Sequence, residues 1–359
     1  MRTPGIFITG IGVFLPAAMS VQQAVAQGRY DADDAELHQL GGAAVAGDTP
    51  APDMALRAAR MALRRGGQLP ERVGLLLYAD SWHQGPDGWQ PQYYLQRELI
   101  GGRALAVETR HGCNGMFSAL EVAASFLLGD AQQQAALIVA SDNFGTPLVD
   151  RWRMGPGYIT GDGASAVVLD RGPGFARLLS VCTVAVPEAE EVHRAGEPLF
   201  PPGPTMGRDL DFAARTAVFN RHAGQPPSSV WLTVHQQLVI TVEKSLSEAG
   251  IAIGDVTRVA FMNYSRQIVE QRGMAALGLP MSMSTWDFGR TVGHLGASDH
   301  IVSFDHLLST GQLGPGEYLL MVSTGPGITI SSAVVQVVAT PPWADGDPPA
   351  SNQGWDADG

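Results

Sequence analysis

Along this chain, apolar runs as long as a β-strand alternate with longer runs of helical periodicity. This alternating pattern occurs in two successive rounds. The first round has strand-like runs at 6–16, 73–81, 104–109, 135–142 and 163–170, and helix-like runs at 51–67, at 91–99 and after residue 113. The second round has strand-like runs at 176–186 and 256–264, helix-like runs at 230–250 and 299–313, and a closing hairpin at 317–338. This pattern predicts an α/β fold in which helices cover mainly buried sheets.

The second round predicts an internal duplication with a boundary near residues 171–176. We therefore divide the chain into an N-terminal half (1–172), a C-terminal half (173–340) and an acidic, Pro-rich tail (341–359) that we expect to be disordered. One further stretch, 187–209, is rich in Pro and Glu and reads as a long surface loop.

The amino-acid composition limits the binding partners and the cellular compartment that we expect. Of the 359 residues, 45% are hydrophobic, which is enough for a large core, and the net charge of -12 argues against nucleic-acid or anionic-membrane partners. Two cysteines make a disulfide framework implausible. No apolar run reaches the roughly 18 residues of a membrane span. Gly10, Gly12 and Pro16 interrupt what would be a signal-peptide core, so we expect a first strand there and a cytoplasmic protein.

Cys113 lies in "RHGCNGMFSALEVAASFLLG" (110–129), between a predicted strand and an apolar helix. A lone cysteine is most often a small buried hydrophobe. At the start of a helix, however, the backbone amides and the helix dipole stabilise a thiolate. Gly112 and Gly115 leave room for a substrate. The position is therefore typical of a cysteine nucleophile.

The best candidate for a partner base lies in "TVGHLGASDHI" (291–301). His294 occupies a Gly-flanked loop, and Asp299 opens the next predicted helix. A chain reversal between them would let the carboxylate fix the imidazole tautomer and leave the other nitrogen for the substrate. The plainer interpretation makes Asp299 an N-cap and His294 a loop residue. A metal site of His294, Asp299 and His300 is weaker, because the spacing matches no zinc signature.

Two glycine-rich stretches accompany these residues. "STGPGITIS" (323–331) can supply an oxyanion amide from Gly327 or, less favourably, Gly325, because Pro326 has no N–H; it is otherwise a simple turn. "GDGASAVVL" (161–169) lacks the lysine and hydroxyl residue of a phosphate loop and reads as a tight turn.

In their order and spacing, six stretches resemble the ketoacyl-ACP synthase III branch of the thiolase superfamily. They are "ITGIGVFLP" (8–16), "HGCNGMFSALEVA" (111–123), "LIVASD" (137–142), "GDGASAVVL" (161–169), "VGHLGASDH" (292–300) and "STGPGITISSAVV" (323–335). The resemblance implies a duplicated, five-layered αβαβα thiolase-like fold, a homodimer, and a narrow pantetheine tunnel that ends at Cys113.

The chain departs from the condensing enzymes of that family at two positions. Where they carry a histidine in a Pro-His-Gln-Ala-Asn stretch, this chain has Met262 or Asn263, and where they carry an asparagine, it has His294. That His/Asn pair stabilises the enolate of malonyl decarboxylation, so its replacement argues against carbon–carbon bond formation. The pattern is similar to ketosynthase-III-like acyltransferases of antibiotic and polyketide tailoring, such as the malonyl-transferring enzyme of cervimycin biosynthesis.

This resemblance implies an acyltransferase with a Cys113, His294 and Asp299 catalytic set. Cys113 would take a malonyl, short alkyl or aryl group from an acyl carrier protein or coenzyme A. His294 would deprotonate a hydroxyl or amine of a sugar, polyketide or other carrier, and the amides of Cys113 and Gly327 would hold the oxyanion. No cofactor or metal is implied, because the phosphopantetheine thioester is a substrate.

Five residues are further candidates for substrate binding, although ordinary packing or solvation explains each equally well. They are Arg151 and Arg153 for the pantetheine phosphate, Trp82 and Trp152 at the entrance, and Asn263 at the position of the missing histidine. The segment 187–224 is a candidate cover for a bulky acceptor.

Three alternatives stay open at the level of sequence. One is a condensing enzyme with an altered catalytic pair. Another is a non-catalytic thiolase-fold subunit that binds acyl carriers. The third is a thioester hydrolase, in which water replaces the acceptor.

Overall fold

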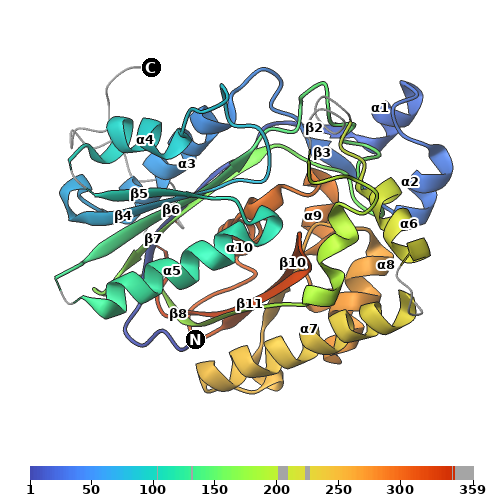
Figure 1. The fold of residues 1–359 in the computed structure, drawn as a ribbon. Coiled ribbons are helices and arrows are strands. Elements are labelled where there is room, and N and C mark those ends of the chain that lie inside the picture. Colours follow the sequence, from blue (N-terminus) through green and yellow to red (C-terminus); the bar gives the residue numbers. More distant parts are fainter. Residues whose placement is uncertain (103, 131, 201–208, 223–226, 342, 344–359) are drawn as a thin grey trace.

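The structure is a computed structural model that describes the chain except for residues 103, 131, 201–208, 223–226, 342 and 344–359 (Figure 1). The strands are β1 Phe7–Phe14, β2 Ala18–Ser20, β3 Gly42–Ala44, β4 Val73–Ala79, β5 Leu105–Thr109, β6 Ala135–Asp142, β7 Gly163–Asp170, β8 Ala176–Ala185, β9 Arg258–Ala260, β10 Tyr318–Gly325 and β11 Thr329–Val337. The helices are α1 Val21–Ala26, α2 Ala32–His38, α3 Ala51–Arg65, α4 Pro91–Leu95, α5 Gly115–Gly129, α6 Phe212–His222, α7 Pro227–Ala249, α8 Arg266–Ile268, α9 Trp286–Val292 and α10 Asp299–Ser309.

The strand order repeats from one half of the chain to the other. The first half is ordered β5-β4-β6-β7-β1 and the second β9-β10-β11-β8. An isolated parallel bridge between Val259 and Ser284 stands where the second half would have its outermost strand. The two sheets join where β1 pairs with β8, at Phe7–Arg177 and Ile8–Ala176. In each half the opening strand therefore lies next to the closing strand, as a duplication requires.

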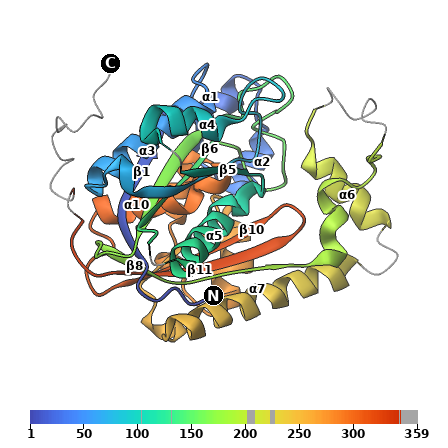
Figure 2. The ribbon, with the colours of Figure 1, turned by 60° about the vertical axis from the view of Figure 1, so that its left-hand side comes forward.

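Helices separate and cover the two sheets (Figures 1 and 2). α3 packs on the outer face of the first sheet, and α7 packs on the outer face of the second. α5 and α10 lie between the sheets, where their apolar residues join the largest buried cluster with β4, β6, β8 and β11. The result is the five-layered αβαβα thiolase fold that the sequence predicted.

The close packing of α3 on β1 explains a glycine in the first strand. α3 begins with Pro52 in its first turn and places small or apolar residues such as Ala58 and Ala62 on its buried face. A Cβ at Gly12 would lie 2.0 Å from the Ala58 carbonyl oxygen. The "GIG" of β1 is therefore a site of close strand–helix contact.

Most predicted elements are present, and the differences are local. The strand expected at 256–264 is reduced to Arg258–Ala260, because the chain then turns to form part of the site. In the stretch expected to be a loop, Pro187–His193 forms helical turns, and α6 follows at Phe212–His222. The division at residues 172 and 173 stays a prediction.

The predicted tail, 341–359, lies outside the described residues except for Pro341 and Trp343. At Trp343 the expectation of disorder is wrong, because this side chain is buried against Phe175 and beneath the guanidinium of Arg65. An aromatic ring in an otherwise polar, Pro-rich stretch supplied enough apolar surface to dock. Among the described residues, no helix is both long and apolar enough to cross a membrane.

Candidate active site

Cys113 lies in a short 3-10 turn, Gly112–Asn114, which leads directly into α5. The turn follows β5, so the cysteine stands at the junction of strand and helix, as predicted. Gly112 has φ +53°, and a Cβ there would lie 2.5 Å from the ring of Pro326. Glycine at this position therefore lets the turn between β10 and β11 pack directly against the cysteine loop.

His294 is held by the segment that precedes β7, although the two are distant in sequence. Its backbone N–H donates to the carbonyl of Ile159 over 2.7 Å, and its carbonyl accepts from Gly161 N over 2.9 Å. The side chain is only 2% exposed. The loop that looked like a phosphate loop is therefore a structural support for His294.

Cys113, His294 and Asp299 form one connected set. His294 Nε2 lies 2.9 Å from Cys113 Sγ, and His294 Nδ1 lies 2.5 Å from Asp299 Oδ2. The thiol is half-buried, whereas the carboxylate is fully buried. The carboxylate fixes the imidazole so that its other nitrogen faces the sulfur.

The surroundings of His294 favour its protonated form. Burial lowers the pKa of His294, but the Cys113 sulfur and the Asp299 carboxylate outweigh burial and raise the pKa well above the ordinary value of 6.5. Both act through charge and through hydrogen bonds to the imidazole. A cysteine sulfur in contact with an imidazole that an aspartate orients is the arrangement typical of a cysteine nucleophile.

Asn263 orients Asp299 rather than facing a substrate. Its side-chain amide donates to Asp299 Oδ1 over 3.0 Å and to the Gly293 carbonyl over 2.9 Å, and its backbone N–H donates to Asp299 Oδ2 over 3.1 Å. Asn263 is 3% exposed. Its predicted role in substrate binding is therefore wrong, because its donors are directed at the carboxylate and at the loop before His294.

Two tyrosines beside His294 were missed from the sequence. The rings of Tyr158 and Tyr264 stack with centroids 4.8 Å apart, and each meets the imidazole nearly at right angles. Tyr264 follows Asn263 directly, but a single aromatic residue in a loop carries no signal of such a contact. Tyr158 lies in a separate segment, before β7, and only the tertiary structure brings it near.

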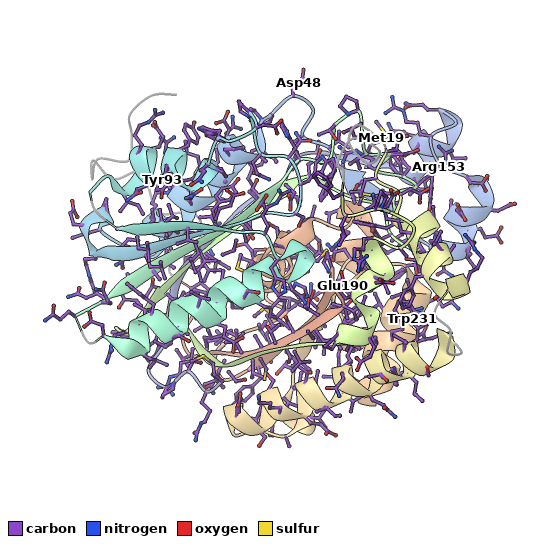
Figure 3. All side chains as sticks on the ribbon, viewed as in Figure 1. Met19, Asp48, Tyr93, Arg153, Glu190 and Trp231 are labelled. Atoms are coloured by element: carbon purple, nitrogen blue, oxygen red, sulfur yellow. The ribbon has the colours of Figure 1, made fainter. Side chains whose placement is uncertain are left out.

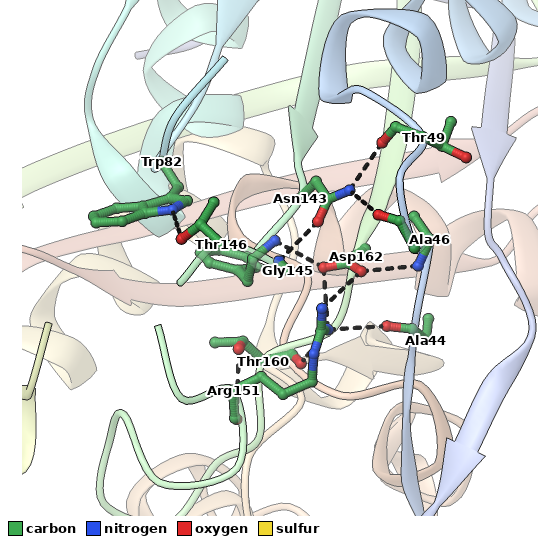
Figure 4. Close-up of polar contacts among 12 residues, drawn as sticks. Ala44, Ala46, Thr49, Trp82, Asn143, Gly145, Thr146, Arg151, Thr160 and Asp162 are labelled. Carbon is green, nitrogen blue, oxygen red and sulfur yellow. Dashed lines mark hydrogen bonds and ion pairs between the residues drawn. The ribbon is translucent and has the colours of Figure 1, made fainter. Parts of the chain in front are cut away.

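The side chain of Arg151 is held by several polar contacts (Figure 4), and Trp152 is buried. Arg151 forms an ion pair with the fully buried Asp162 over 2.9 Å and also donates to the carbonyls of Ala44 and Thr160. Trp152 is 4% exposed and packs against Tyr30. Both residues also line a cavity of about 460 Å³ together with Arg153, and their roles in substrate binding stay predictions.

Arg153 and Trp82 remain accessible. Arg153 lies at the edge of the molecule and pairs with the exposed Asp150 over 3.2 Å (Figure 3). Trp82 donates its ring N–H to Thr146 over 2.9 Å and lines a cavity of about 570 Å³, whose walls also include Arg110 and Trp89. Their roles in substrate binding stay predictions.

The alternative metal ligand His300 is turned away from the other two residues. Its Nε2 lies 2.9 Å from the carbonyl of Val322, and its ring meets Phe117 edge-on. Within the part of the chain that the structure describes, no three His, Cys, Asp or Glu side chains are grouped as metal ligands.

Gly327, the predicted oxyanion donor, lies in the turn between β10 and β11 with φ +73°. Asn114, the neighbour of Cys113, donates its side-chain amide to Thr329 over 2.8 Å and so ties this turn to the start of α5. The turn is correctly located for the predicted role, which stays a prediction.

An apolar cavity of about 220 Å³ lies between α7 and the site. Its walls include Trp231, Leu238, Phe261, Met262, Tyr264 and Ile328. Tyr264 belongs both to this cavity and to the cover of His294. The cavity therefore lies directly behind one wall of the site.

The fold and the Cys–His–Asp geometry define a thiolase-fold protein with a cysteine site. The sequence matches the family descriptions of 3-oxoacyl-[acyl-carrier-protein] synthase III over residues 107–185 and of its C-terminal part over residues 246–337. The solved structure of the acyltransferase ChlB3 is 63% identical, covers 94% of this chain and 99% of its own, and superposes with a TM-score of 0.91.

More distant relatives agree in fold. Beta-ketoacyl-[acyl-carrier-protein] synthase III of Erythrobacter litoralis is 25% identical over 92% of this chain and 98% of its own. The structure of 3-oxoacyl-(acyl carrier protein) synthase III from Pseudomonas aeruginosa is 22% identical over 93% of this chain and 99% of its own, with a TM-score of 0.75. The chain belongs to the ketoacyl-ACP synthase III family of the thiolase superfamily.

Proposed function

We propose that this enzyme transfers an acyl group from a carrier thioester to a hydroxyl or amine through an acyl-Cys113 intermediate. The observation that carries the proposal is the contact of His294 Nε2 with Cys113 Sγ at 2.9 Å while Asp299 holds His294 Nδ1. The 63% identity to the acyltransferase ChlB3 supports it. The donor is an acyl carrier protein or acyl-CoA, and the acceptor is a sugar, a polyketide or another carrier.

The reaction has two balanced steps. In the first, Cys113 Sγ attacks the thioester carbonyl, the carbon–sulfur bond of the donor breaks, and His294 protonates the departing thiol. In the second, His294 takes a proton from the acceptor as its oxygen or nitrogen attacks, and the carbon–sulfur bond to Cys113 breaks. The backbone amides of Cys113 and Gly327 hold the oxyanion in both steps.

The chemistry at positions 262 and 263 argues against the condensing alternative. Met262 or Asn263 stands where the condensing enzymes carry a histidine. The Met262 sulfur accepts the N–H of Thr324 over 3.3 Å, and the Asn263 side-chain amide donates to Asp299 and to the Gly293 carbonyl. A thioether donates no hydrogen bond, so it cannot stabilise an enolate oxygen. A non-catalytic role is also disfavoured, because such a role gives no reason for a connected Cys–His–Asp set.

Two structural features near the site are candidates for contact with the proposed substrates. The apolar cavity beside Tyr264 offers a path for a pantetheine arm or an acceptor. The segment 187–224 contributes α6, and the backbone N–H of Phe212 at its start donates to the carbonyl of Met154. We further propose a homodimer, as the family resemblance implies.

Intact-mass screening against a panel of acyl thioesters tests the proposal. The wild type gains the mass of one acyl group, Cys113→Ala gains none, and the matched control Cys182→Ala behaves as the wild type, because Cys182 is buried away from the site. His294→Ala acylates slowly and transfers about 10² to 10⁴-fold more slowly than the wild type. The absence of any adduct would overturn the proposal. Carbon dioxide release coupled to a new carbon–carbon bond from malonyl carrier would favour the condensing reaction instead.

A further inference from the structure

The imidazole of His294 is enclosed on more sides than its two hydrogen bonds require. Cys113 and Asp299 occupy its two nitrogens. The rings of Tyr158 and Tyr264 lie 5.4 Å and 5.0 Å from the imidazole centroid, at interplanar angles of 74° and 83°. The tyrosine rings themselves stack with an interplanar angle of 13°. Together these four side chains leave His294 only 2% exposed.

The surrounding backbone is shaped to hold this tyrosine pair. A Cβ at Gly155 would lie 2.0 Å from Cζ of Tyr158, so only glycine admits that ring. The N–H of Ser265 donates to the carbonyl of Gly157 over 2.7 Å and joins the two loops that carry the tyrosines. The ring N–H of Trp286 donates to the Tyr264 carbonyl over 3.1 Å. Two segments about a hundred residues apart are thus fixed against one imidazole.

The tyrosines act through their rings rather than through a titrating hydroxyl. Burial, followed by the Cys113 charge, raises the pKa of Tyr158 above its ordinary range. Burial and the same charge also raise the pKa of Tyr264. Both phenols therefore stay neutral, and within the described residues neither hydroxyl has a hydrogen-bond partner.

An acyl-Cys113 intermediate would face a competing reaction. Water beside His294 would lose a proton to the imidazole, attack the thioester carbon, break the carbon–sulfur bond and release a carboxylic acid and the Cys113 thiol. An acceptor uses the same base for the same step, so the enzyme must keep water away until the acceptor arrives.

We propose that Tyr158 and Tyr264 are positioning residues that hold the imidazole of His294 in line with Cys113 and exclude water from it, so that the acyl group waits for its acceptor. This inference rests on the acyltransferase function proposed above. Tyr264 also borders the apolar cavity, so the acceptor that displaces this protection approaches from the cavity side.

The test compares the lifetime of the acyl-enzyme in variants that keep or lose the rings. The full-length protein is loaded with p-nitrophenyl butyrate, desalted, and followed by intact mass without acceptor at neutral pH. Tyr158→Leu and Tyr264→Leu shorten the lifetime about 10-fold or more, because water reaches the general base. Tyr158→Phe and Tyr264→Phe keep the wild-type lifetime. The control Tyr94→Leu leaves the lifetime unchanged. It removes a tyrosine ring whose hydroxyl donates a hydrogen bond to Asp53 on α3.

A second readout separates this inference from the acyltransferase proposal. The rate of iodoacetamide alkylation of Cys113 is measured against pH in the same variants. The leucine variants require a higher pH for fast alkylation, because the imidazolium no longer stands beside the sulfur, whereas the phenylalanine variants match the wild type. If the wild type forms no adduct with this ester or with any acyl thioester of the panel, the acyltransferase proposal fails and this profile still tests the tyrosine pair. Where a leucine variant does not fold, the methionine variant at that position replaces it. Wild-type lifetimes and profiles in the leucine or methionine variants would overturn the inference.

Discussion

Asp299 and Asp142 are both buried carboxylates near the start of α10, yet their surroundings differ. Asp299 is 0% exposed and accepts hydrogen bonds on both oxygens, from Asn263, His294 and the backbone N–H of Leu295. Asp142 is 1% exposed, and within the described residues its Oδ2 has no partner. The Oδ2 atom faces Gly296, where a Cβ would lie only 2.5 Å away.

Asp299 contacts an imidazole, whereas the hydrogen bonds to Asp142 come from N–H donors. Burial raises the pKa of Asp142 to about 7, although the backbone N–H groups of Ser81 and Trp82 partly offset the rise. The pKa of His294, which contacts Asp299, is raised well above 6.5 against the effect of burial. Both oxygens of Asp299 have partners, an imidazole and N–H donors, whereas one oxygen of Asp142 has none among the described residues.

Among the substitutions that we predict, Asp299→Asn has the largest expected effect on the rate of acyl transfer. In Asp299→Asn the imidazole loses the acceptor that fixes its tautomer, and we expect the rate of acyl transfer to fall by about 10² to 10⁴-fold. Single-turnover transfer from the loaded enzyme measures this loss. Asp142→Asn is the matched control, because Asp142 makes no hydrogen bond to His294, and it retains transfer within a few-fold. Equal losses in the two variants would contradict the assigned roles.

The pH dependence of protein stability tests whether burial raises the pKa of Asp142. A carboxyl whose folded pKa is raised from 3.8 to about 7 contributes stability below pH 3.8, and that contribution is lost as the pH rises through 7. Asp142→Asn removes the cost of ionisation and keeps an oxygen for the backbone donors. The variant therefore gains on the order of 3 kcal/mol relative to the wild type between about pH 5 and pH 8. Urea unfolding at both pH values measures the gain.

The control for this experiment is Asp48→Asn, at an exposed carboxylate. Its unfolding free energy should follow the wild type at both pH values. If the unfolding free energy of Asp142→Asn changed with pH in the same way as that of the wild type, the buried carboxyl would not be protonated in the folded state at pH 5.

Substitution of Asn263 has the smallest expected effect on the rate of acyl transfer. Asn263→Ala removes the side-chain donor to Asp299 but leaves the His294–Asp299 contact, so we expect a loss of transfer of about tenfold or less. In the Asp299→Asn background the same substitution has little further effect, because the two residues act as a unit. Additive losses in the double variant would show that Asn263 acts elsewhere. A pH–rate profile that shifts in Asn263→Ala would support action through the dyad.

The accuracy of the sequence predictions depended on how local their physical causes are. The place of Cys113 at the junction of strand and helix was predicted correctly, because a strand, a glycine and an apolar helix follow one another within a single stretch. His294 and Asp299 were found together because only five positions separate them along one loop. The contacts of Arg151 with Asp162 and of Trp152 with Tyr30 could not be predicted, because these partners are not adjacent to them in the sequence.

The alternating α/β pattern, its duplication, the cysteine at the helix start and the family resemblance follow from the amino-acid sequence, because periodicity and turn residues act between near neighbours. The contact of His294 with Cys113, the hydrogen bonds of Asn263 to Asp299 and the two tyrosines around the imidazole follow from the folded chain. These contacts join residues that are distant in the sequence, so burial and hydrogen-bond geometry, rather than local pattern, select each partner.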